Sequence, residues 1–206
     1  MENFTRSCVN TNVVGKAFNP PFMNVSFENV EKFEKALGSL VIEFSKLEFS
    51  LTYYCALIEN PYNHTAVLRK YLGSELKAKR NKIKSFIYTN LEDLKTEWDV
   101  INSKIGSINQ ERRHLIHGIG RSYFLLDAIK TIIKKGDEIV SKEYSVNDIK
   151  IITDKLSHLL TGDNGLEGEF LVKFTSQLFD NLNKKVLDDK KVVYRVNGEI
   201  LTEWKG

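Results

Sequence analysis

Apolar residues recur every third or fourth position over the first long patterned stretch of the chain, which is the spacing of an amphipathic helix. Ser26 is a candidate N-cap at its start, and Pro61 ends the pattern. The sequence therefore predicts a helix from about Ser26 to Asn60. We assign its buried side to the apolar residues Phe33, Leu37, Val41, Phe44, Leu51, Cys55 and Ile58.

One position in this apolar series holds a charged residue. Position 48 is Glu48, which lies between Phe44 and Leu51 in the same 3–4 spacing. A carboxylate on a buried face costs several kcal/mol, roughly, unless a cation or good hydrogen-bond donors meet it. Glu48 therefore predicts a partner elsewhere in the chain.

A second helical region is predicted over residues 65–87, with a break at Gly73–Ser74. Its segment RKYLGSELKAKRNKIK carries seven basic residues and one acidic residue, Glu75. Two interpretations are open: a solvated helix face, or a surface that faces RNA phosphates. The second interpretation names as RNA-binding residues Lys77, Lys79, Arg80, Lys82 and Lys84.

The third long helix is predicted from about Leu91 to Ile116, because its apolar spacing is sustained over many turns. The series consists of Leu94, Trp98, Ile101, Ile105, Ile108, position 112, Leu115 and Ile119. Position 112 is Arg112. One helix thus has a carboxylate where an apolar residue belongs, and another has a guanidinium. We expect the two helices to meet in a buried Glu48–Arg112 ion pair.

The pattern changes after Gly118 and Gly120. Residues 122–145 contain runs rich in β-branched and aromatic side chains on both sides of a Gly136–Asp137 turn. This composition favours two or three short strands, with a helix over 122–134 as the alternative. Ser145 and Asp148 form a capping box for a helix that Gly162 ends. A last helix follows, and Asn197–Gly198 predicts a type I′ hairpin.

These elements predict a mainly α fold: a helical bundle with a few short antiparallel strands and a C-terminal β-hairpin. We divide the chain into an N-terminal loop or arm (1–25), a helical domain (26–186) and a hairpin (187–206) packed on the same domain. The 206 residues, 42% hydrophobic and 28% charged, suit one globular domain. The net charge of +3 permits an anionic partner without requiring one.

Three features of the sequence indicate the cellular compartment of the protein. No run approaches the ~18 uninterrupted apolar residues of a membrane span, and the N-terminal segment MENFTRSCVN lacks the features of a signal peptide. Two cysteines, Cys8 and Cys55, do not make a disulfide framework. The expectation is a cytoplasmic protein without a membrane partner.

Several kinds of chemistry are excluded by what the sequence lacks. It has no Gly-rich phosphate loop, no nucleophile elbow and no obviously activated cysteine. His114 and His117 stand three positions apart on one helix face, but they lack the carboxylate and third ligand of helical zinc motifs. We therefore expect no metal and no cofactor.

The segment ERRHLIHG, residues 111–118, pairs an arginine with a histidine five positions later and a following glycine. It resembles the signature of the HEPN superfamily (higher eukaryotes and prokaryotes nucleotide-binding domain). The matching residues are Glu111, Arg112, Leu115, Ile116, His117 and Gly118, whereas Arg113 replaces the usual Asn, Asp or His. The resemblance covers roughly residues 27–120 and implies a HEPN-like helical bundle.

What the resemblance implies is a metal-independent endoribonuclease, with Arg112 and His117 as catalytic residues and a composite site in a homodimer. It also suggests toxin or phage-defence biology, with an antitoxin or other regulatory protein as a further partner. The alternative is a non-catalytic HEPN-like module that binds nucleotide or RNA, or only dimerises. Glu48, Glu111, Arg113 and His114 would support the site.

Arg112 and His117 lie about 140° apart on an ideal helix, five steps of ~100° each, so they do not share a face. This separation is a difficulty for a site built on one helix. Two plain alternatives stay open: Arg112 as a structural partner of Glu48, and His117 as a helix-end histidine favoured by the dipole. Arg113 would lower the pKa of His117, or add to the grip on phosphate.

Overall fold

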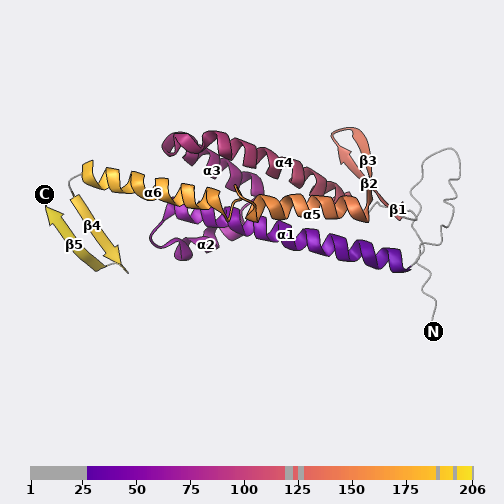
Figure 1. Cartoon of the computed structure of the whole chain (residues 1–206), viewed down its shortest axis with the longest axis horizontal. Helices are drawn as coiled ribbons and strands as arrows, with labels where there is room; N and C mark the ends of the chain where they lie inside the picture. The colour runs from indigo at the N-terminus through magenta and orange to yellow at the C-terminus, as the bar shows by residue number, and fades with distance from the viewer. Residues whose placement is uncertain (1–26, 119–122, 125–127, 189–190, 197–198, 206) are drawn as a thin grey trace.

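The computed structural model describes residues 27–118, 123–124, 128–188, 191–196 and 199–205. The helices are α1 (Phe27–Glu59), α2 (His64–Leu72), α3 (Leu76–Asn90), α4 (Lys95–Gly118), α5 (Val146–Thr161) and α6 (Glu169–Asp188), with a 3₁₀ turn, η1 (Glu92–Leu94), before α4. The long helices α1 and α4 and the α5–α6 pair lie alongside one another, and a hairpin of strands lies at one end of α4 (Figure 1). The prediction of a mainly helical fold is confirmed.

α1 is the central element, and it packs against α2, α3 and α5. Its buried side differs by one position from the predicted series at two points. Leu40 and Leu47 are fully buried, whereas Val41 is 44% exposed and Glu48 is only half-buried. Because a helix has 3.6 residues per turn, either of two neighbouring positions can continue an apolar series. Glu48 therefore does not lie in the core, and Leu47 fills its place.

The predicted buried face of α4 is confirmed. Its apolar residues enter the same core as those of α1, α3, α5 and α6. The break between α2 and α3 falls at Gly73, as predicted. Buried α4 residues include Leu115 and the following members of the predicted series: Trp98, Ile101, Ile105 and Ile108.

The segment after α4 forms a three-stranded antiparallel sheet in the order β1 (Tyr123–Phe124), β2 (Ala128–Lys135), β3 (Glu138–Ser145). β2 and β3 pair along their whole length, from Ala128 opposite Ser145 to Lys135 opposite Glu138. Gly136 makes the turn with a φ of 63°, a backbone conformation that glycine adopts without strain. The strand prediction is confirmed, and the helix alternative is wrong for residues 128–134.

The turn from sheet to α5 is the predicted capping box. The Ser145 hydroxyl accepts a hydrogen bond from the Asp148 backbone N–H, and the Asp148 carboxylate accepts one from the Ser145 N–H. These two bonds satisfy backbone donors that a helix start leaves without partners. α5 then runs to Thr161, with Gly162 as its C-cap.

The loop between α5 and α6 is fastened to α1. Tyr54 donates its phenol hydrogen to the Leu166 carbonyl at 2.5 Å, and Ser50 hydrogen-bonds the Glu167 carboxylate. Leu166 is fully buried beside them. Burial raises the pKa of Tyr54 well above its usual range, so the phenol stays a donor. Residues far apart in sequence are thus joined at the middle of the bundle.

β4 (Lys191–Val196) and β5 (Glu199–Lys205) pair antiparallel and lie beyond the C-terminal end of α6 (Figure 1). The expected turn at Asn197–Gly198 and the predicted arm at 1–25 lie outside the described residues. Each helix that the structure describes is too short or too polar to span a bilayer.

Candidate functional site

The ERRHLIHG segment forms the last two turns of α4 and packs against the β2–β3 hairpin. Glu111 makes the connection to β3. Its carboxylate accepts hydrogen bonds from Lys142 Nζ at 2.8 and 3.1 Å and from the Tyr144 hydroxyl at 2.6 Å. Glu111 therefore fixes the hairpin to the helix.

The electrostatics of this connection follow from its surroundings. Burial alone would raise the pKa of Glu111, but the hydrogen bonds from Lys142 and Tyr144 outweigh it, so the net pKa is lowered. Burial and the Glu111 hydrogen bond raise the pKa of Tyr144. The carboxylate is therefore charged and the phenol is neutral at physiological pH.

Arg112 does not form the expected ion pair with Glu48, and this prediction is wrong. Its guanidinium lies over the Phe44 ring, with Cζ 4.3 Å from the centroid. Among the described residues no ion pair joins Arg112 to Glu48, which stands one turn further along α1. A guanidinium over an aromatic face gains electrostatic attraction without a carboxylate. The two helices do meet near Arg112, but through a cation–π contact.

Arg113 and His117 lie one helical turn apart on the exposed side of α4 and line one hollow in the surface. The hollow has a volume of about 300 Å³ and is completed by three residues of β2: Ile132, Ile133 and Lys134. Arginine and lysine side chains carry only hydrogen-bond donors, and an imidazole can donate or accept a hydrogen bond. The hollow thus combines two basic side chains with one imidazole.

Other motif residues point inward. His114 and Leu115 are buried, and so is Gly118 at the end of the helix. A Cβ on Gly118 would lie 2.8 Å from Thr131 Cβ and 3.4 Å from the backbone nitrogen of Ile132. Only glycine lets the helix end approach β2 this closely. The hairpin therefore forms one wall of the hollow because position 118 carries no side chain.

The structure does not bring Arg112 and His117 together, as their angular separation on the helix predicted. The residue that shares the hollow with His117 is Arg113, which the sequence resemblance marks as a departure. The i, i+4 spacing of Arg113 and His117 was a sequence signal for this pairing. No local pattern pointed to Ile132, Ile133 or Lys134, because their position depends on how the hairpin docks.

The predicted RNA-facing basic surface is not one surface. Lys79 is only 3% exposed, and its Nζ lies 3.4 Å from the Glu48 carbonyl oxygen. Arg80 is half-buried and donates to Asn102, from Nε to Oδ1 at 2.6 Å and from a terminal nitrogen to the carbonyl at 2.8 Å. These two cations hold α3 to α1 and α4. Their assignment as RNA-binding residues stays a prediction, and both cations already have hydrogen-bond partners within the fold.

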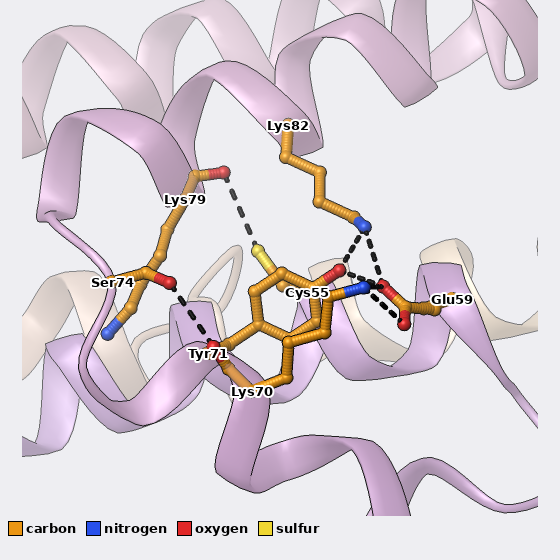
Figure 2. A network of polar contacts seen from close by, with 7 residues as sticks. All are labelled: Cys55, Glu59, Lys70, Tyr71, Ser74, Lys79 and Lys82. Atoms are coloured by element: carbon orange, nitrogen blue, oxygen red, sulfur yellow. Dashed lines mark hydrogen bonds and ion pairs between the residues drawn. The ribbon is translucent and has the colours of Figure 1, made fainter.

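Lys82 belongs to a polar network between α1, α2 and α3 (Figure 2). Glu59 accepts hydrogen bonds from Lys70 at 2.7 and 2.9 Å, from Lys82 at 3.2 Å and from the Tyr71 hydroxyl. Hydrogen bonds from Lys70 and Tyr71 lower the pKa of Glu59 to about 2. Burial raises the pKa of the neighbouring Cys55 thiol to about 11, so this cysteine is not activated.

Of the remaining predicted RNA-binding residues, Lys77 is exposed, and Lys84 lies 3.8 Å from the Asp99 carboxylate. Neither lines the hollow on α4. Within the described ranges no group of three or more His, Cys, Asp or Glu residues is arranged to hold a metal ion. The hollow on α4 is lined by two basic side chains and a histidine, which are groups that bind anions such as phosphate.

Searches against family models, curated proteins and solved structures found no match to this chain.

Proposed function

We propose that this chain is a HEPN-like, metal-independent endoribonuclease that binds an RNA phosphate in the hollow on α4. The observation that carries the proposal is that Arg113 and His117 line the same open hollow, with Lys134 beside them. The ERRHLIHG resemblance supplies the reaction class and the independence from metal. The hollow supplies the charge and the proton-carrying group that such a reaction needs.

The reaction would proceed by attack of the RNA 2′-oxygen on the neighbouring phosphorus. A base accepts the 2′-hydroxyl proton, the bond from phosphorus to the 5′-oxygen breaks, and an acid protonates that leaving oxygen. The products are a 2′,3′-cyclic phosphate and a 5′-hydroxyl. Arg113 and Lys134 would stabilise the negative charge that builds on the phosphoryl oxygens.

His117 is one imidazole, whereas the reaction uses a base and an acid on opposite oxygens. Because an unperturbed histidine titrates near pH ~6.5, the same residue type suits both roles. A second copy of the chain would supply the second His117 across a composite cleft. The homodimer is therefore part of the proposed activity.

The test compares purified wild-type protein with His117→Ala on RNA in the presence of EDTA. His158→Ala is the matched control, because His158 is also an exposed histidine near a helix C-terminus and does not line the hollow. We expect cleavage that ends in cyclic phosphate, lost in His117→Ala and kept in His158→Ala. Absence of cleavage of every RNA class by a folded, dimeric wild-type protein would contradict the enzyme.

A second candidate is the non-catalytic RNA-binding or dimerisation module, and one observation favours it. Arg112, which the family pattern makes catalytic, is engaged with Phe44 and makes no described contact with His117. RNA binding that depends on Arg113, without cleavage, would select this module. A toxin or phage-defence role and a regulatory partner such as an antitoxin rest on the sequence resemblance alone.

A further inference from the structure

A second apolar series runs along α1, on the side of the helix that faces solvent. Ile42 is 61% exposed, Phe49 is 53% exposed and Val41 is 44% exposed, although each is a large hydrophobic residue. Gly38 and Ser45 are exposed on the same side of the helix. The order Gly38, Ile42, Ser45, Phe49 alternates steps of four and three residues, which is the spacing of a face that packs against another helix. We call these five residues the outer seam of α1.

The outer seam could be buried without leaving a polar group unpaired. The Ser45 hydroxyl donates a hydrogen bond to the Val41 carbonyl at 2.9 Å, so it already has an acceptor within α1. None of the five residues carries a charge, although 28% of the residues in the chain do. A Cβ on Gly38 would meet no described atom within 4 Å, so the surface is open there. Burial of this face therefore carries no desolvation cost from an unsatisfied donor or a lone charge.

The outer seam lies on a different side of α1 from the end of α4. Arg112 of α4 lies over the ring of Phe44, which is buried. Phe49 follows Phe44 by five residues and projects about 140° away from it, at ~100° per residue. Figure 1 shows the N-terminal half of α1 along the lower edge of the bundle, with α5 along its upper side. The seam therefore faces away from the helix that carries the hollow.

We propose that the outer seam is a self-association surface, at which α1 packs antiparallel against α1 of a second copy of the chain. A two-fold axis through the middle of the seam, between positions 43 and 44, pairs the two ends of the seam with each other. Gly38 then meets the partner's Phe49, and Ile42 meets the partner's Ser45. Each large side chain faces a small residue, so the seam is complementary to itself in size. This inference goes beyond the proposed function, because the contact does not involve the hollow.

The distribution of charge and size favours this occupant and this direction. In a two-fold contact the same surface lies on both sides, so a charge within the seam would face an equal charge. The seam has none, and the flanking Lys46 is already paired with Glu43 at 2.6 Å. A parallel pairing in register would instead set Phe49 against Phe49 and Gly38 against Gly38. That arrangement would crowd one end of the contact and leave a gap at the other.

The seam is short, and this limits the strength of the association. One pair of helices makes an interface below the ~1,200 Å² at which stable complexes begin. We expect a dissociation constant on the order of 100 µM. The chain would then be mostly monomeric in dilute solution and would associate as its concentration rises.

The experiment is sedimentation equilibrium of the full chain from about 10 µM to about 1 mM, a range that spans the expected dissociation constant. Ile42→Glu places a carboxylate in the seam and should weaken association by about tenfold or more. Val172→Glu is the matched control, because Val172 is a 67% exposed apolar residue of α6, outside the seam. A wild-type chain that stays monomeric over the whole range, or equal weakening in the two variants, would overturn the proposal.

Gly38→Phe tests the antiparallel register. In the proposed pairing it sets two phenylalanines against each other, and it should weaken association by about tenfold, as for an overpacked contact. Adding Phe49→Ala again places one large and one small side chain at each contact. The double variant should recover to within about threefold of wild type, because the two substitutions are coupled across the interface. No recovery in a double variant with wild-type helix content would overturn the antiparallel pairing.

His117→Ala separates this inference from the proposed function. It removes the imidazole on which the proposed cleavage depends, and position 117 lies outside the seam. His117→Ala should associate as the wild type does, whereas Ile42→Glu should not. Association that is lost in His117→Ala and kept in Ile42→Glu would locate the contact between copies at the hollow and overturn the seam. Absence of RNA cleavage together with association through α1 would contradict the proposed function and support the seam.

Discussion

The guanidinium of Arg112 lies over the ring of Phe44, 4.3 Å from its centroid, and this contact joins the C-terminal part of α4 to α1. An arginine in an apolar series does not need a carboxylate to be accommodated. Its planar charge lies over an aromatic face, which attracts it electrostatically. The side chain is thereby directed away from the hollow that Arg113 and His117 line.

Replacing Arg112 should therefore have a modest effect on stability. Arg112→Met keeps much of the aliphatic stem and removes the cation, and we expect a loss of about 0.5–1 kcal/mol of unfolding free energy. The measurement is chemical denaturation, with Phe44→Leu and the double variant completing a cycle. A loss of several kcal/mol that Glu48→Gln relieves would instead indicate the buried ion pair.

Adding a methyl group at Gly118 should disturb the packing of the hairpin on α4. In Gly118→Ala the new Cβ would lie 2.8 Å from Thr131 Cβ, so β2 must move. We expect destabilisation of about 1–3 kcal/mol, as for overpacked sites, together with weaker RNA binding. Thermal and chemical unfolding measure the first effect.

Gly38→Ala is the control for this substitution. Gly38 is also in a helix, but a Cβ there meets nothing within 4 Å. Alanine should stabilise α1 by about 0.5–1 kcal/mol through its higher helix propensity. If both variants are stabilised, the close approach of α4 and β2 is not a constraint.

The Glu111 connection should make hairpin docking depend on pH. Its pKa is lowered in the folded chain, so the carboxylate stabilises the fold at pH values above its unfolded pKa. This stabilisation is lost as the pH falls through the lowered folded value. Glu111→Gln should cost about 1 kcal/mol at neutral pH, discounted for partial exposure. The difference from wild type should vanish in acid, as stability curves at several pH values would show.

The Glu59 network, between α1, α2 and α3, should make a second acid-sensitive contribution to the free energy of unfolding. Hydrogen bonds from Lys70 and Tyr71 lower the Glu59 pKa to about 2, so its contribution persists from neutral pH down to the ordinary range of a glutamate. Between that range and pH of about 2 it is lost. Glu59→Gln should remove this dependence.

Tyr71→Phe tests the same network at its centre. It keeps the buried ring and the Lys82 amine 4.6 Å from the ring centroid, but removes the hydroxyl that joins Glu59 and Lys82. The NMR titration of Glu59 should then shift to higher pH. An unchanged Glu59 titration in Tyr71→Phe would show that the lysines alone hold the carboxylate.

Much of the fold follows from local patterns. Break and cap residues such as Gly73, Ser145, Asp148 and Gly162 lie where the sequence placed the ends of helices. The phase of α1 is the exception, because 3.6 residues per turn leaves the choice between Leu40 and Val41 to packing against α5. That one-position choice removed Glu48 from the core and, with it, the reason for the expected ion pair.

The candidate site was predicted in part. The helix end that carries it is the predicted one, and His117 is exposed there. Local periodicity says which residues share a helix face, so it separates Arg112 from His117. It does not say which face of α4 the hairpin will cover. The packing of the hairpin on α4 is what places Lys134 in the same hollow as Arg113.

The residues of the hollow all fall between positions 113 and 134, and the Glu111 connection extends this span only to Tyr144. Contacts between residues close in sequence close short loops and cost little chain entropy. The geometry of the hollow is therefore assembled from the end of α4 and from β2, two elements that are close in sequence. We expect the contact between the end of α4 and the β2–β3 hairpin to form early in folding, before the long-range contacts that join α1 to the loop after α5.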